Sequence, residues 1–200
     1  MEFVKEFAIF LHKNEIIKFG DFTLASGKKS SYYIDLRQVP SFPHEFRSMV
    51  RYLQKNITYY IGLDFDSIVS VPTGGLVIAS ALAIETVKPL IYVRSKAKDH
   101  GTSKSIEGKI HEGMKVLMID DVATTGGSVV NAIKSLKEAK INVTDAYVIV
   151  NRMEGADQAL EEQGVRLHSI VNVIQITQEL YEQNFVDDIV LQKVKNQIRN

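Results

Sequence analysis

Two adjacent carboxylates followed by hydroxyls and glycines form the most chemically distinctive segment of the chain. Asp120 and Asp121 end an apolar run that begins at Val116, and the sequence continues Val-Ala-Thr-Thr-Gly-Gly-Ser up to Ser128. Beyond Ser128, apolar and charged side chains alternate at helical spacing. The polar segment is therefore predicted to be a turn between a buried strand and a helix.

Such a turn is suited to binding a phosphate monoester. Backbone N–H groups face the anion at the positive end of a helix, and Gly126 and Gly127 let the main chain come close to it. Thr124, Thr125 and Ser128 add hydroxyl donors. We therefore expect the turn to hold a phosphate group.

The two aspartates need another ligand, because a carboxylate repels a phosphate. Vicinal hydroxyls or a divalent cation would suit them. A ligand with a phosphate at one end and a diol close by is a ribose 5-phosphate. The alternative is that these residues only cap a helix. A cap needs one polar residue, whereas this segment contains five polar residues and two glycines.

Alternating strands and helices would position this turn. Strands are predicted at 67–71, 90–93, 116–119 and 146–150, with helices at 43–57, 74–86 and 130–140. Strands that alternate with helices imply a parallel sheet with ligands at the carboxyl ends of its strands. Outside this core we predict a helix over residues 1–16, a turn at 19–21, a small antiparallel element, and elements at 154–163, 168–173 and 186–198.

Composition limits the chain to one α/β domain with a small subdomain, since it has 200 residues of which 45% are hydrophobic. The 24 basic and 24 acidic residues balance, which argues against nucleic acid and anionic membranes as partners. Cysteine is absent, and neither a signal peptide nor an apolar run of membrane-spanning length is visible. We expect a cytoplasmic protein.

Two other segments stand out by their glycines. Thr73-Gly74-Gly75 follows a predicted strand and opens a helix, which suits a pyrophosphate group, although Gly-Gly turns are common without ligands. Residues 95–115 hold three glycines and little apolar material between two predicted strands. Because a connection of this length without a core pattern is usually functional or disordered, we interpret it as a mobile lid.

The segment from Val116 to Ser128 resembles the phosphoribosyl pyrophosphate (PRPP) signature of type I phosphoribosyltransferases, which transfer ribose 5-phosphate to nitrogen bases. The resemblance implies a single domain over residues 1–200: a mostly parallel sheet flanked by helices, an N-terminal hood over residues 1–40, and a mobile catalytic loop over residues 95–115. It implies that the two aspartates bind the ribose hydroxyls. The PRPP-binding residues that it implies are Asp120, Asp121, Ala123, Thr124, Thr125, Gly126, Gly127, Ser128, Thr73, Gly74 and Gly75.

The run that begins at Arg94 is similar to the catalytic loop of the orotate phosphoribosyltransferase branch. The shared pattern is R-x-x-x-K-D-H-G, although solvated charge is the default interpretation of such a run. In that branch the loop closes over the pyrophosphate and usually reaches into the partner subunit of a homodimer. The resemblance implies that Arg94, Lys98 and His100 neutralise the leaving group and that Asp99 takes the acid position.

A third segment, from Phe22 to Tyr33, resembles the part that this branch uses against the base, although an ordinary hairpin is the alternative. Arg152 matches an arginine that pairs with the orotate carboxylate, and a bidentate guanidinium suits that planar anion. Arginine at a strand end is also often only a surface residue. The implied orotate-binding residues are Thr124, Arg152, Tyr33, Ile34, Ser26 and Lys28.

Three departures separate the chain from many bacterial members of the branch. Ala25 and Ser95 stand where those members have lysines, and Gly74 and Gly75 stand where they have a Tyr-Lys pair. The Pro-Thr-Gly-Gly version is more similar to archaeal members. Fewer cations predict a weaker hold on PRPP.

Taken together, the resemblances imply transfer of ribose 5-phosphate from PRPP to orotate, which gives orotidine 5′-phosphate and pyrophosphate. They imply Mg2+ as cofactor, held mainly by PRPP near Asp120 and Asp121 with no direct protein ligand. Contact with orotidine 5′-phosphate decarboxylase is a further expectation. Two alternatives stay open: a phosphoribosyltransferase for another base, and a PRPP-sensing regulator, which should show a basic face or a DNA-binding domain.

Overall fold

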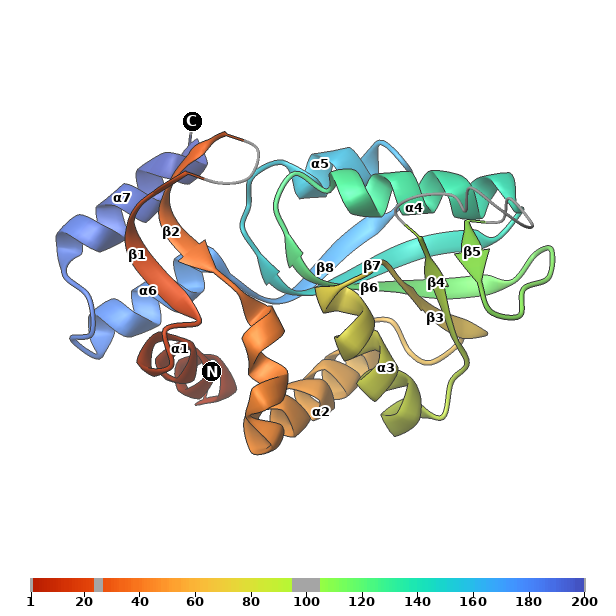
Figure 1. Ribbon diagram of the computed structural model, residues 1–200, viewed down its shortest axis with the longest axis horizontal. Helices are drawn as coiled ribbons and strands as arrows, with labels where there is room; N and C mark the ends of the chain where they lie inside the picture. Colours follow the sequence, from red (N-terminus) through yellow and green to blue (C-terminus); the bar gives the residue numbers. More distant parts are fainter. Residues whose placement is uncertain (1, 24–26, 95–104, 200) are drawn as a thin grey trace. The chain divides into compact units, whose positions relative to one another are not determined.

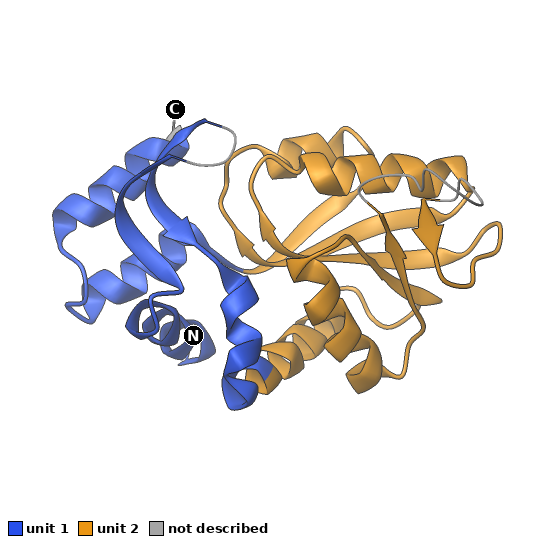
Figure 2. Ribbon diagram, in the orientation of Figure 1, with its two compact units in different colours: residues 1–46, 171–200 blue, residues 47–170 orange. Residues whose placement is uncertain are grey.

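The chain folds into two compact units. A computed structural model describes residues 2–23, 27–94 and 105–199 (Figure 1). Unit 1 contains residues 1–46 and 171–200, and unit 2 contains residues 47–170 (Figure 2). The predicted hood of residues 1–40 falls within unit 1, which also contains the C-terminal segment.

Unit 2 is built on a six-stranded sheet in the order β5-β4-β3-β6-β7-β8. The strands are β3 (Ser67–Ser70), β4 (Leu90–Val93), β5 (Ile106–Glu107), β6 (Lys115–Ala123), β7 (Asn142–Asn151) and β8 (Arg166–Asn172). The neighbours β4, β3, β6 and β7 run parallel, and β5 is antiparallel to β4. The predicted α/β class with a mostly parallel sheet is confirmed.

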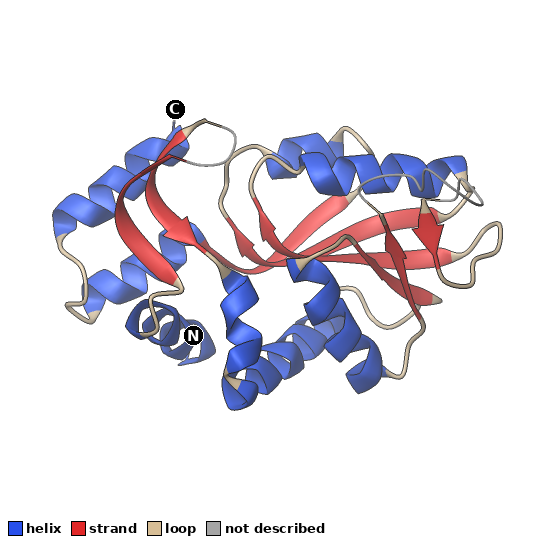
Figure 3. Ribbon diagram, viewed as in Figure 1, coloured by secondary structure: helices blue, strands red, loops and turns tan. Residues whose placement is uncertain are grey.

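Helices cover both faces of this sheet (Figure 3). On one face lie α2 (Pro43–Tyr60) and α3 (Gly74–Thr86), and on the other lie α4 (Gly127–Glu138) and α5 (Ala156–Glu161) (Figure 1). Val69 and Met118 of the sheet join Ile133 and Leu136 of α4 in one buried apolar cluster. Burial of this apolar face is what fixes α4, and with it the turn that precedes α4.

Unit 1 combines a two-stranded antiparallel ribbon with helices. Its elements are α1 (Glu2–Lys13), β1 (Ile17–Thr23), β2 (Lys29–Ile34), a 3-10 helix (Leu36–Ser41), α6 (Val173–Glu182) and α7 (Asp188–Arg199). Phe7 and Leu11 on the inner face of α1 are buried. Gln197 of α7 ties the helix to the ribbon, because its Oε1 accepts hydrogen bonds from Ser31 N at 2.6 Å and Ser31 Oγ at 2.9 Å.

Three further features differ from the sequence predictions. The expected turn at residues 19–21 lies inside β1, where the pairing with β2 shifts register between Phe19 and Phe22. Helix α6 was missed, although Asn172 and Gln175 form a capping box at its start. The predicted lid of residues 95–115 extended too far, because β5 pairs with β4 and both Ile106 and Met114 are buried.

Among the described residues, no helix combines the length and the apolar character that a membrane crossing requires.

Candidate active site

Three neighbouring parallel strands of unit 2 end at the same edge of the sheet, and each leads into a polar loop. Ser70 at the end of β3 pairs with Ile119, and Ala123 at the end of β6 pairs with Asn151 at the end of β7. The loops that follow these strands lead to α3, α4 and α5. Carboxyl ends of parallel strands are where α/β proteins bind ligands, so these loops form the candidate active site.

The two aspartates lie within β6, not after it, because β6 continues to pair with β7 as far as Ala123. Asp120 is 7% exposed, and its Oδ1 accepts a hydrogen bond from Asp121 N at 2.9 Å. Burial, and then the negative charge of Asp121, raise the pKa of Asp120 well above its usual value. A ligand that brings hydroxyl donors or a cation would therefore stabilise the ionised form of Asp120.

The turn before α3 packs directly against these aspartates. A Cβ atom on Gly75 would lie 2.8 Å from Asp120 Cα and 2.9 Å from Ser70 Oγ, and a Cβ atom on Gly74 would lie 2.6 Å from Asp121 Cγ. Thr73 is exposed and, as the residue before α3, makes no side-chain capping bond. The glycines bring two chain segments together, and the first N–H groups of α3 keep the capacity to bind an anion.

The turn before α4 also begins its helix without a side-chain cap. Gly126 precedes α4 with a left-handed φ of 78°, and a Cβ atom on it would lie 2.9 Å from Leu160 Cδ1. Among the described residues, the hydroxyls of Thr124, Thr125 and Ser128 have no hydrogen-bond partner. The capping interpretation of this segment is therefore not supported, and the hydroxyls and the helix N-terminus are suited to a phosphate.

The loop after β7 holds a buried arginine beside this turn. Arg152 N donates a hydrogen bond to Ala123 O at 2.9 Å, and the side chain of Arg152 is 6% exposed. Glu154 Oε1 accepts hydrogen bonds from Arg152 Nε at 3.1 Å and Nη2 at 2.9 Å. Sequence reasoning found Arg152 but missed Glu154, for which the only signal was an acid two residues after the arginine.

Comparisons with known proteins agree with this geometry. A sequence model of the phosphoribosyl transferase domain matches residues 42–183. The chain is 48% identical, over its whole length and that of the relative, to the orotate phosphoribosyltransferase of Cenarchaeum symbiosum. The chain belongs to the orotate phosphoribosyltransferase family. The predicted resemblance, including its archaeal character, is confirmed.

Solved structures of the family show the same fold. The orotate phosphoribosyltransferase of Aeropyrum pernix is similar with a TM-score of 0.78 and 34% identity, over 90% of this chain and 99% of that one. Leishmania donovani UMP synthase is similar with a TM-score of 0.85 and 34% identity, over 97% of this chain. This chain spans 42% of the length of that UMP synthase.

The residues that the family resemblance assigned to the base lie mainly in unit 1. Tyr33 is 37% exposed and its ring lies 5.9 Å from that of Phe22, whereas Ile34 is only 8% exposed. Successive strand residues point to opposite faces, so Ile34 belongs to the core of unit 1 and only Tyr33 presents its side chain. Lys28 is exposed, and Ser26 lies outside the described residues.

The predicted catalytic loop of this orotate phosphoribosyltransferase family member is described only at its edges. Arg94 Nη1 donates a hydrogen bond to Glu107 Oε1 at 3.0 Å, and Arg94 N donates to Ser105 O at 2.8 Å. Lys98, Asp99 and His100 lie outside the described residues. Arg94 is thus attached to the edge of the sheet at β5.

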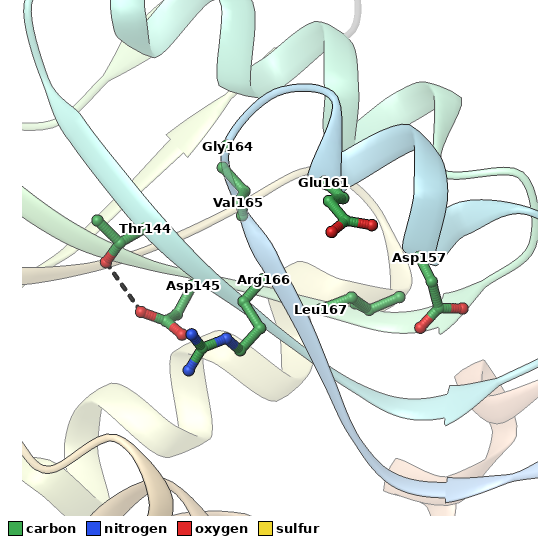
Figure 4. Close-up of a pocket in the computed structure, with 8 residues that line it drawn as sticks. All are labelled: Thr144, Asp145, Asp157, Glu161, Gly164, Val165, Arg166 and Leu167. Atoms are coloured by element: carbon green, nitrogen blue, oxygen red, sulfur yellow. Dashed lines mark hydrogen bonds between the residues drawn. The ribbon is translucent and has the colours of Figure 1, made fainter.

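A cavity of about 550 Å³ elsewhere in unit 2 has the wrong charge for a phosphate (Figure 4). Its lining consists of Thr144, Asp145, Asp157, Glu161, Gly164, Val165, Arg166 and Leu167. Three carboxylates and one guanidinium make it acidic, and Thr144 Oγ1 already donates to Asp145 Oδ2 at 2.8 Å. The sheet edge, not this cavity, therefore fits the substrate of the family.

Within the described part of the chain, no group of three or more His, Asp or Glu side chains is arranged to hold a metal ion.

Proposed function

We propose that the protein transfers ribose 5-phosphate from PRPP to orotate, which gives orotidine 5′-phosphate and pyrophosphate in pyrimidine biosynthesis. The observation that carries this proposal is the meeting of a carboxylate pair with two uncapped, glycine-containing helix starts at one sheet edge. The two helix starts suit the two phosphate-bearing ends of PRPP, and the carboxylates suit the ribose diol between them. The names of the relatives identify orotate as the base that accepts the ribose 5-phosphate.

In this proposal the bond between ribose C1′ and the pyrophosphate oxygen breaks while orotate N1 forms a bond to C1′. Positive charge develops on the ribose and negative charge on the leaving oxygens, so catalysis is mainly electrostatic and positional. Asp120 and Asp121 hold the diol, residues 123–128 hold the 5-phosphate, and Thr73, Gly74 and Gly75 hold the pyrophosphate. Orotate N1 loses its proton to solvent before the bond to C1′ forms, so the nitrogen reacts as an anion and no general base on the protein is required.

The carboxylate pair fits a substrate that carries Mg2+. Mg2+ would be held mainly by PRPP oxygens and water, with Asp120 and Asp121 near the ion but not bound to it directly. When bound, the ion would neutralise charge on the pyrophosphate.

Base recognition and leaving-group stabilisation are assigned to other residues. We propose that Arg152 pairs with the orotate carboxylate, with Thr124, Tyr33, Ser26 and Lys28 as further contacts to orotate. Ile34, which is 8% exposed, is proposed as a further contact to orotate. For the catalytic loop, we propose that Lys98, His100 and Arg94 neutralise the pyrophosphate, with Asp99 as the acid of the motif.

We further propose a homodimer that uses the exposed face of α3. Apart from Ser80, Glu85 and Thr86, this helix consists of glycine and apolar residues, which is typical of a buried helix. Yet the side chains of Val77 and Ile84 are 41% and 80% exposed. Ile84→Glu should therefore yield monomers in sedimentation experiments. If the Ile84→Glu variant forms a dimer as stable as that of the wild type, the proposal is contradicted.

The partial match to UMP synthase also supports contact with orotidine 5′-phosphate decarboxylase, because UMP is formed when orotidine 5′-phosphate loses its carboxylate.

A direct assay tests the proposed reaction. Purified protein is mixed with PRPP, Mg2+ and orotate, and the loss of orotate absorbance is followed, with Asp121→Asn as the inactive variant. Asp64→Asn is the matched control, because the side chain of Asp64 is 96% exposed and lies at the opposite end of the sheet. Loss of orotate by the wild type and the control, but not by Asp121→Asn, is expected. Consumption of another base without loss of orotate would refute the proposal.

A further inference from the structure

We infer that Glu154 is a positioning residue that orients Arg152 toward the carboxylate of the base and so sets the preference for orotate over uracil. The inference rests on the proposed function, because it takes Arg152 as the partner of the orotate carboxylate. It adds a residue that the family motifs in the sequence did not include.

The geometry of the pair fixes the guanidinium. A single carboxylate oxygen, Glu154 Oε1, accepts from both Nε and Nη2 of Arg152 at 3.1 and 2.9 Å. Two bonds from one edge of the planar fork determine both its plane and the direction in which it points. The side chains are 6% and 1% exposed, so water competes little with these bonds.

The backbone around Arg152 is fixed independently of Glu154. Arg152 N bonds to Ala123 O, which anchors the loop to the phosphate-binding turn. Asn151 Oδ1 accepts a hydrogen bond from Met153 N at 2.7 Å, and Asn151 Nδ2 donates to the two carboxylate oxygens of Asp157 at 3.0 and 3.1 Å. Met153 is held in a left-handed conformation with φ of 59°.

Because Asn151 and Ala123 hold the main chain, removal of the Glu154 charge should weaken its bonds to Arg152, loosen the arginine side chain and leave the loop in place. A long arginine side chain that is already ordered loses little conformational freedom when it binds an anion. Orotate would benefit from this order, whereas uracil, which has no carboxylate, would not. The effect should therefore appear in the orotate parameters and not in those of PRPP.

A purely structural role for Glu154 makes a different prediction. If it only compensated a buried positive charge, its removal would lower stability and affect orotate, uracil and PRPP alike. A rise in the KM for orotate alone therefore indicates a positioning role. An equal rise in the KM values for orotate and PRPP indicates a structural role.

Steady-state kinetics with Glu154→Gln tests the inference, with Arg152→Met measured in parallel. Glu154→Gln keeps the shape of the side chain and removes its charge. It should raise the KM for orotate about tenfold and leave the KM for PRPP within about twofold. It should also lower the ratio of kcat/KM for orotate to kcat/KM for uracil. Glu161→Gln, an exposed glutamate on α5, is the matched control and should behave as wild type.

Glu154→Asp provides a second variant if Glu154→Gln does not fold. It keeps the charge but shortens the reach to Arg152, and it should raise the KM for orotate in the same selective way. An unchanged KM for orotate in a folded Glu154 variant, or an equal rise of both KM values, would overturn the inference. If Arg152→Met raises the KM for orotate while the Glu154 variants do not, only the inference fails. If Arg152→Met leaves it unchanged, the assignment of Arg152 fails, and the inference fails with it.

Discussion

A Cβ atom on Gly75 would lie 2.8 Å from the Cα of Asp120, so the turn before α3 and the strand that carries the aspartates leave no room for a side chain between them. The obstructing atom belongs to the main chain of β6, which is paired on both sides within the sheet. It cannot move aside as a flexible side chain would. Glycine at this position is therefore required by the approach of the two segments.

Gly75→Ala should destabilise the protein by about 1–3 kcal/mol, because overpacking against a paired strand forces backbone shifts. Thermal unfolding should show a melting temperature lowered by several degrees. Gly127→Ala is the control for stability, since its Cβ would lie 3.9 Å from Thr125 Oγ1, which is an ordinary van der Waals contact. A Gly75→Ala variant that melts with the wild type would show that the two segments can separate without cost.

The stability of the unliganded protein should depend on pH through Asp120. Burial and the charge of Asp121 raise its pKa above 3.8, so the folded state binds this proton more tightly than the unfolded state. The stability contribution of Asp120 therefore falls as pH rises from the unfolded-state value through the raised folded-state value. Asp120→Asn has no charge to bury. The melting temperature of Asp120→Asn minus that of the wild type should therefore increase as pH rises across this window. A difference that stays constant with pH would contradict the raised pKa.

Val87 should be a site where substitution stabilises the protein. It ends α3 with φ of 54° and ψ of 40°, and it is 89% exposed. A β-branched residue is strained in this left-handed conformation, whereas glycine is not. Val87→Gly should gain about 1 kcal/mol and raise the melting temperature by about 2–4 °C. Ala81→Gly within the same helix should have the opposite effect, and a lower melting temperature for Val87→Gly would refute the strain argument.

Lys98→Ala should lower kcat about 100-fold or more, because a cation at the leaving pyrophosphate acts mainly in the transition state. Lys98 lies outside the described residues, so the expectation comes from the resemblance of its motif. Circular dichroism and thermal melting should match the wild type. Turnover at the wild-type rate would remove Lys98 from the catalytic residues.

Elements with a strong local pattern could be predicted from the sequence. Helix α3 and strand β4 have the predicted bounds, 74–86 and 90–93, because glycines open the helix and a short apolar run forms the strand. The aspartates and the turn before α4 were found for the same reason: carboxylates, hydroxyls and glycines follow one another within a few residues. A functional site can be recognised from the sequence when all its residues are adjacent in the chain.

Features that depend on distant partners could not be predicted. The extension of β6 through Asp121 depends on pairing with β7, and the inclusion of residues 171–200 in unit 1 depends on the packing of α6 against α1. The burial of Ile34 and the hydrogen bonds of Glu154 to Arg152 are likewise consequences of packing.

The central claim is that one sheet edge binds PRPP and delivers its ribose 5-phosphate to orotate. A competition experiment tests it most directly: the protein is incubated with PRPP, Mg2+ and equal amounts of orotate, uracil and adenine, and nucleotides and pyrophosphate are separated by chromatography. The account predicts orotidine 5′-phosphate and pyrophosphate in equal amounts, and neither product from Asp121→Asn. Formation of UMP or AMP in place of orotidine 5′-phosphate, or full activity of Asp121→Asn, would contradict it.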